Sequence, residues 1–157
     1  MQKITPFLWF EGNAEEAMKF YTSVFKNSRV GNVNRYDGGE SGPQGGFITG
    51  SFTLEGQEFM AISINAAAPF RFTEAISLFV NCETQEEVDY FWDKLAAGGS
   101  TSQCGWLKDK YGLSWQIVPS ILNKLLQGTD RAKSKKVMDA MLKMTKLDIA
   151  ILKKAGE

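Results

Sequence analysis

The chain has 157 residues, of which 43% are hydrophobic and 23% are charged, so it can bury a core as one domain or two very small ones. Its 18 lysines and arginines balance 18 aspartates and glutamates, which argues against bulk attraction to nucleic acid or to an anionic membrane. Histidine is absent, and this excludes catalytic sites that need imidazole and metal sites with a histidine ligand.

The cysteine count and the N-terminal residues indicate the cellular compartment in which the protein works. Cys82 and Cys104 are too few for a zinc-finger set or a disulfide framework. The opening MQKITPFLWFEGN has only a short apolar run, unlike a signal peptide, and no window approaches the length of a membrane span. We therefore expect a cytoplasmic protein with reduced thiols.

A repeat relates two helical segments, residues 13–21 (NAEEAMKFY) and 84–92 (TQEEVDYFW), which are 71 positions apart. Each starts with an N-cap residue and has glutamate three positions later, in the manner of a capping box: Asn13 with Glu16, and Thr84 with Glu87. Apolar residues then follow at helical spacing. The pattern predicts two helices, which end near Asn27 and near Gly98-Gly99.

Strand-like runs surround both helices. In the first half they are Ile4–Phe10, Arg29–Tyr36, Phe47–Leu54 and Glu58–Ile64, with the glycine-rich stretch 38–46 as a loop. In the second half they are Ile76–Val80, Gln103–Lys108 and Leu113–Val118, with an abbreviated strand near Ser100–Ser102. The chain therefore resembles a duplicated β-α-β-β-β unit, with module one at 1–68 and a trimmed module two at 69–119.

Residues 120–157 have a helical pattern and form a predicted tail. Ser120 is expected to cap a short helix that ends at Gly128, Thr129 or Asp130 to cap the next, and 147–152 to form a third. The tail is basic, but it lacks the aromatic residues that stack nucleic-acid bases, so we interpret its charge as a solvated helix face. We expect the tail to pack on the body or on a partner subunit.

Together with the repeat, two strings, PFLWFEGNAEEAMKFY and QCGWLKDKYGLSWQIVP, resemble the PhnB-like subfamily of the vicinal oxygen chelate superfamily. That superfamily includes glyoxalase I, bleomycin-resistance proteins and extradiol dioxygenases, and the subfamily is often labelled 3-demethylubiquinone-9 3-methyltransferase. The likeness is taken to cover nearly the whole chain, tail included. It implies an α+β fold in which two βαβββ modules form a U-shaped mixed sheet around a cavity, and it implies a homodimer.

The metal enzymes of the superfamily have four ligands, one on the first and one on the last strand of each module. By resemblance these positions fall at Thr5 or Pro6, near Ser63, at Glu74 and at Gln116. Only Glu74 and Gln116 suit a divalent metal, and such a metal generally needs about three protein ligands. We therefore expect no metal and no other cofactor.

The resemblance places Gln116 towards the cavity. With a four-residue loop at 109–112, Gly105 would pair with Gln116, Trp106 with Trp115, and Leu107 with Ser114. Gly105, Leu107 and Ser114 would then face the cavity beside Gln116, and Gly105 would leave space for a ligand. The two tryptophans would pack on the outer face under a helix.

Aromatic residues near the strands have two interpretations, as core packing or as a pocket wall that stacks a planar ligand. They are Phe7, Trp9, Phe52, Phe59, Phe70, Phe72 and Phe79. Trp9 completes the predicted ligand-binding set of Glu74, Gly105, Leu107, Ser114 and Gln116.

The predicted function is to bind a small, partly aromatic ligand in the sheet cavity without a catalytic metal. Three alternatives remain: a metal-dependent lyase, isomerase or dioxygenase with Glu74 and Gln116 as remnant ligands; the methyl transfer of the family label; and a structural dimer whose tail docks a partner. Whether any reaction is catalysed stays open. The label conflicts with the sequence, because the chain has no strand-glycine-helix element of the doubly wound sheet common among methyltransferases.

Overall fold

The computed structural model describes residues 2–40 and 45–157, so part of the predicted loop at 38–46 lies outside the described residues. The chain divides into two compact units, Met1–Arg71 and Phe72–Glu157. No helix among the described residues is long and apolar enough to cross a bilayer.

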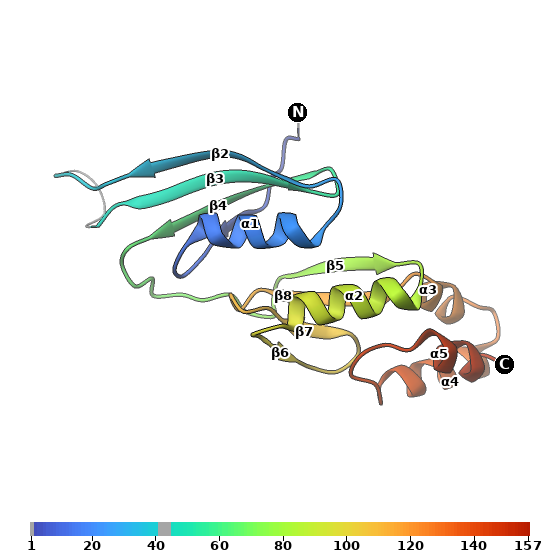
Figure 1. Cartoon of the computed structure of the whole chain (residues 1–157). Helices are drawn as coiled ribbons and strands as arrows, with labels where there is room; N and C mark the ends of the chain where they lie inside the picture. Colours follow the sequence, from blue (N-terminus) through green and yellow to red (C-terminus); the bar gives the residue numbers. More distant parts are fainter. Residues whose placement is uncertain (1, 41–44) are drawn as a thin grey trace. The chain divides into compact units, whose positions relative to one another are not determined.

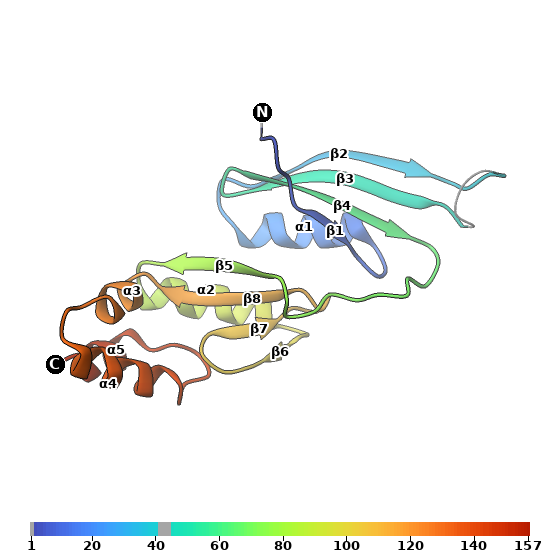
Figure 2. The same cartoon turned by 180° about the vertical axis from the view of Figure 1, so that it is seen from behind.

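The first unit is a four-stranded mixed sheet with one helix. Its elements are β1 (Phe7–Trp9), α1 (Ala14–Val24), β2 (Arg29–Tyr36), β3 (Phe47–Leu54) and β4 (Gln57–Ile64). The strand order is β1-β4-β3-β2, with β1 parallel to β4 and the other pairs antiparallel (Figures 1 and 2). Helix α1 covers one face of this sheet, and aromatic side chains from both layers pack in the core: Phe10, Tyr21, Phe52 and Phe59.

The second unit repeats this topology. Its elements are β5 (Ser77–Cys82), α2 (Gln85–Ala96), β6 (Ser100–Thr101), β7 (Trp106–Lys108) and β8 (Ser114–Pro119). The strand order β5-β8-β7-β6, with β5 parallel to β8, matches that of the first unit (Figure 1). Module two therefore keeps all four strands, but it is trimmed at β6 and β7, which have two and three residues where β2 and β3 have eight each.

Capping explains where the two repeated helices begin. The Asn13 side chain accepts a hydrogen bond from the Glu16 amide at 3.2 Å, and the Thr84 hydroxyl accepts one from the Glu87 amide at 3.2 Å. In α2 the Glu87 carboxylate also accepts from the Glu83 amide at 2.7 Å. Both predicted N-caps are confirmed, and each satisfies backbone donors that a helix start leaves without partners.

The tail contains three helices, α3 (Ile121–Leu126), α4 (Arg131–Met141) and α5 (Ile149–Ala155). Asp130 caps α4 and Asp148 caps α5. The predicted cap at Ser120 is wrong: this residue has helical backbone angles and its side chain makes no capping bond.

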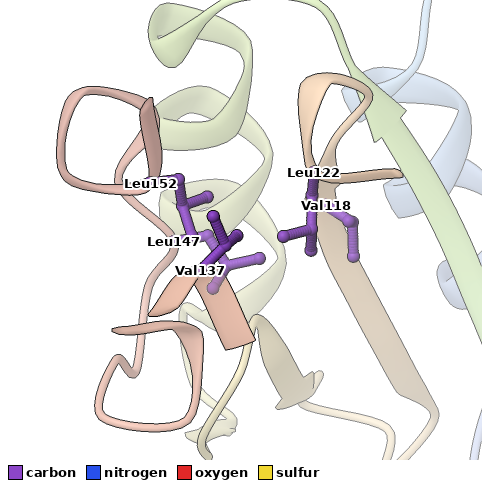
Figure 3. Packing of buried hydrophobic residues seen from close by; sticks show 5 residues of the cluster. All are labelled: Val118, Leu122, Val137, Leu147 and Leu152. Carbon is purple, nitrogen blue, oxygen red and sulfur yellow. The ribbon is translucent and has the colours of Figure 1, made fainter. Parts of the chain in front are cut away.

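The tail packs on the body of the second unit. Val118 of β8 joins Leu122, Val137, Leu147 and Leu152 in a buried group that we call the tail cluster (Figure 3). The backbone around Met144 also binds the body, because Met144 and Thr145 carbonyls accept from the Cys104 and Gly105 amides, both at 2.8 Å. The α+β class, the two βαβββ modules and the helical tail are thus confirmed, whereas the U-shaped arrangement around a cavity stays a prediction.

Candidate ligand-binding site

The hairpin of β7 and β8 has a different register from the predicted one. Lys108 pairs with Ser114, Leu107 with Trp115, and Trp106 with Gln116. The predicted register is therefore wrong by one residue, and such a slip moves a strand's side chains to the other face of the sheet. Leu107 shares the face of the buried Trp115, whereas Trp106 shares the face of Gln116.

The loop explains the slip, because it has five residues rather than four. The Asp109 amide donates to the Leu113 carbonyl at 2.9 Å, which closes the loop one residue later than predicted. The Asp109 side chain fills the loop and accepts from the Tyr111 and Leu113 amides at 2.8 and 3.1 Å. Its other oxygen accepts from the indole of Trp115 at 2.8 Å, so one buried carboxylate holds the loop and β8 together.

A pocket of about 540 Å³ lies in the second unit, along β6, β7 and the start of β8. Its lining residues are Glu74, Ser100, Thr101, Ser102, Gln103, Cys104, Trp106, Leu107, Lys108 and Ser114. Three of the six predicted ligand-binding residues, Glu74, Leu107 and Ser114, therefore border one cavity. The Leu107 side chain is only 1% exposed, so it contributes mainly to the core.

The pocket holds an ion pair that sequence reasoning missed. The ammonium of Lys108 lies 2.5 Å from the carboxylate of Glu74. Lys108 holds the pKa of Glu74 below its ordinary value, chiefly through this hydrogen bond, so the Glu74 carboxyl is ionised at neutral pH. With the correct loop length, strand alternation would have placed Lys108 beside Ser114.

Ser114 has an unusual environment for a serine. It is fully buried, and its hydroxyl oxygen has no hydrogen-bond partner among the residues that the structure describes. A buried hydroxyl without a partner typically costs about 1–3 kcal/mol. It lines the pocket opposite Lys108, so a polar group in the pocket is the natural partner for this oxygen.

The structure places Gly105 away from the pocket. Gly105 has a φ of +82° and is bonded to Ile117, whose amide donates to its carbonyl at 2.7 Å, rather than paired with Gln116. A β-carbon on Gly105 would lie 2.6 Å from the Ile117 carbonyl and 3.2 Å from the Leu147 side chain. The expected space for a ligand is therefore filled by the backbone of β8 and by the tail.

Gln116 and Trp9 also lie outside the pocket lining. The Gln116 amide donates to the hydroxyl of Ser77 at 2.9 Å, on the face shared with Trp106. Trp9 belongs to the first unit, where it is 37% exposed and packs edge-to-face against Phe70 at 5.1 Å. It therefore lies on the face of the first sheet opposite α1.

Three of the four positions that resemble metal ligands have side chains that bond groups of their own unit. Ser63 faces α1, where its hydroxyl accepts from the Ala14 amide at 3.0 Å. Glu74 and Gln116 are bonded to Lys108 and Ser77. Within residues 2–40 and 45–157, no three His, Cys, Asp or Glu side chains gather where one ion could bind them.

The two thiols differ in accessibility, which gives a direct prediction. Cys82 is fully buried, and burial, aided by the Glu87 and Glu83 carboxylates, raises its pKa from 9.0 to about 12. At pH 8 its thiolate should be about a thousandfold scarcer than that of an ordinary thiol. A disulfide reagent should therefore label the partly exposed Cys104 first and Cys82 only after unfolding. Single Cys→Ala variants assign the two phases, and equally fast labelling of both native thiols would contradict the prediction.

The family of this chain follows from a match over most of its length. The model of the 3-demethylubiquinone-9 3-methyltransferase family matches residues 2–118. The chain belongs to this family. The match ends before the tail, so the expectation that the likeness includes residues 120–157 is wrong with respect to the family model.

Solved structures support the same assignment. A Bacillus cereus PhnB protein that carries this family's label is 47% identical, with 76% of this chain and 100% of that chain covered and a TM-score of 0.68. A glyoxylase/bleomycin resistance protein/dioxygenase domain from Frankia is 13% identical, with 76% and 92% covered and a TM-score of 0.50. The fosfomycin resistance protein FosX from Listeria monocytogenes, solved with Mn(II) and a dihydroxypropylphosphonic acid, is 12% identical, with 73% and 90% covered and a TM-score of 0.50.

The family match and the Bacillus cereus structure confirm the resemblance to the PhnB-like subfamily. The two distant structures support the fold alone. None of the curated proteins matches this chain.

Proposed function

We propose that this PhnB-like chain binds a small, partly aromatic ligand in the pocket of its second unit, without a catalytic metal. The observation that carries the proposal is the hydroxyl of Ser114, which is buried at the pocket and has no partner within residues 2–40 and 45–157. Native proteins rarely leave such a group unsatisfied, and functional sites are where the exceptions need an explanation. A ligand atom that bonds this oxygen would recover the lost hydrogen bond.

The remaining lining residues suit a ligand of mixed character. Trp106 supplies apolar aromatic surface, and Ser100, Thr101 and Ser102 supply hydroxyls along the edge strand and the residue after it. An apolar wall with a few convergent polar groups is the usual composition of a small-molecule site. The pocket also has enough volume for a single-ring compound and its substituents, at about 540 Å³.

The direct test is thermal unfolding of chelator-treated protein with benzoate, benzamide and phenol at millimolar concentration. A compound that binds the folded state raises Tm in a saturable way. We expect at least one of the three to do so without added metal. No saturable rise with any of them would contradict the proposal, and a rise that requires Mn²⁺ or Zn²⁺ would contradict its metal-free part and favour a metal enzyme.

Replacing Ser114 with alanine should separate binding from stability. The variant removes a buried group without a partner, so the free protein should be more stable by roughly 1 kcal/mol. Binding of the compound that gave the rise in Tm should weaken, because its partner oxygen is gone. Opposite changes in these two quantities are the expected result, measured by urea unfolding and by calorimetric titration.

Ser134 offers a matched control in the same unit. Its hydroxyl already bonds the carbonyls of Leu125 and Gly128, at 3.4 and 3.5 Å, and it lies outside the pocket lining. Ser134→Ala should leave binding unchanged and should not raise stability. If Ser114→Ala binds as tightly as the wild type, the role of this hydroxyl in binding is contradicted.

The family label, methyl transfer, makes a separate prediction that can be tested on the same purified protein. A methyltransferase must bind S-adenosylmethionine, whereas neither sheet has the doubly wound topology common among such enzymes. We expect no heat of binding with S-adenosylmethionine at millimolar concentration. Saturable binding would revive methyl transfer as the function.

A further inference from the structure

The charge distribution of the pocket narrows the class of ligand. Lys108 and Glu74 are the only charged residues among the described residues that line it. They differ in their setting: Lys108 lies on β7, between two paired strands, whereas Glu74 lies in the segment before β5. The Glu74 side chain is also the more exposed, at 62% against 40% for Lys108.

Three recognition groups meet on one wall of the pocket. Lys108 and Ser114 lie opposite each other on neighbouring strands, and Trp106 lies two residues before Lys108 on the same face. Side chains directly opposite in an antiparallel pair have β-carbons about 5 Å apart. An ammonium and a hydroxyl can therefore bond one small group, while the indole contacts the part of the ligand next to it.

The carboxylate of Glu74 occupies the position at the Lys108 ammonium that the carboxylate of a ligand would take, so it acts as an internal competitor. Its carboxylate bonds the ammonium in the structure, so the half-buried lysine is not left unpaired. A carboxylate from outside has the same charge and the same hydrogen-bonding atoms. Because Glu74 is mostly exposed, it regains water when it is displaced, which keeps the exchange inexpensive.

We propose that the ligand is a planar aromatic anion, whose carboxylate replaces Glu74 at Lys108 and bonds Ser114 while its ring lies against Trp106. This inference rests on the proposed function and specifies its ligand class. The Ser114 oxygen is covered in the structure, so we expect side chains at the pocket wall to shift when a ligand bonds it. The exchange makes no covalent bond.

The test compares benzoate with the neutral benzamide, which has nearly the same shape. Calorimetric titration at neutral pH should show that the wild type binds benzoate about tenfold more tightly than benzamide, as expected for a hydrogen bond to a charged group. Lys108→Gln should remove this preference. Glu74→Gln should strengthen benzoate binding several-fold, because the internal competitor is gone.

Opposite effects from the two partners of one ion pair distinguish this inference from a structural role. If the pair served only stability, both substitutions would change Tm and neither would alter the ratio of benzoate to benzamide affinity. Lys135 and Asp139 of α4 form a matched surface pair at 2.6 Å, outside the pocket lining. Lys135→Gln and Asp139→Asn should leave the ratio unchanged.

The outcomes also separate this inference from the function on which it rests. Equal affinity for benzoate and benzamide would overturn the anion inference and leave small-molecule binding intact. A preference for benzoate that persists in Lys108→Gln would overturn it as well. If neither compound nor phenol binds, the proposed function fails and the inference fails with it. Glu74→Gln keeps the test decisive if Lys108→Gln does not fold.

Discussion

Replacing Asp109 with alanine should destabilise the second unit by roughly 3–5 kcal/mol. Asp109 is 2% exposed, and its carboxylate accepts hydrogen bonds from the Tyr111 and Leu113 amides and from the Trp115 indole. Alanine would leave these donors without their partner in the interior. Urea unfolding followed by tryptophan fluorescence reports on this unit, which holds three of the four tryptophans.

Two variants calibrate this prediction. Asp109→Asn keeps an oxygen for the backbone amides but turns a donor towards the Trp115 indole, so its cost should be intermediate, at about 2 kcal/mol. Asp130→Ala removes a carboxylate that caps α4 at the surface, with bonds of 3.0 and 3.2 Å to the Ala132 and Lys133 amides, and should cost about 1 kcal/mol. If Asp109→Ala cost no more than Asp130→Ala, the role assigned to the buried carboxylate would be wrong.

Replacing Leu147 with alanine should lower the free energy of unfolding by about 2–5 kcal/mol. Leu147 is 1% exposed in the tail cluster (Figure 3), and its side chain packs against the backbone of Gly105. The substitution removes buried apolar atoms and leaves a cavity between the tail and the body. Urea unfolding followed by tryptophan fluorescence measures this loss in the free energy of unfolding.

A second leucine in the tail provides the control. Leu142 is 53% exposed, and its replacement by alanine should change stability by no more than about 0.5 kcal/mol. Equal effects from the two leucines would contradict the packing of the tail on the body. A large effect at Leu147 and a small one at Leu142 would show that the tail is part of the folded unit. That result would argue against the hypothesis that the tail serves only to dock a partner.

Secondary structure followed from local signals. The strands Arg29–Tyr36 and Phe47–Leu54 have the predicted bounds, and both repeated helices begin at their predicted caps. Alternation of side chains and an N-cap bond depend on residues a few positions apart, which a single sequence displays directly. The repeat then implied two equivalent modules, and the matching strand orders of the two units confirm it.

Which residues of β7 face the pocket depended on the length of the loop between β7 and β8. The pattern of Gln103–Lys108 and Leu113–Val118 indicates a hairpin, but a loop of four or five residues leaves that pattern unchanged. The buried carboxylate of Asp109 favours five residues, and the resulting register places Trp106, rather than Leu107, on the same sheet face as Lys108 and Ser114. The predicted Ser114 and Glu74 do line the pocket, whereas Lys108 and Trp106 were missed.

By itself the sequence determined the α+β class, the duplicated modules, the family and the absence of imidazole chemistry, since composition, periodicity and motif strings contain these directly. Only the tertiary structure decided that Leu147 fills the space beside Gly105 and that Lys108 pairs with Glu74. Both contacts join residues more than 30 positions apart. Such contacts depend on register, loop closure and packing of distant segments, and no local pattern encodes these.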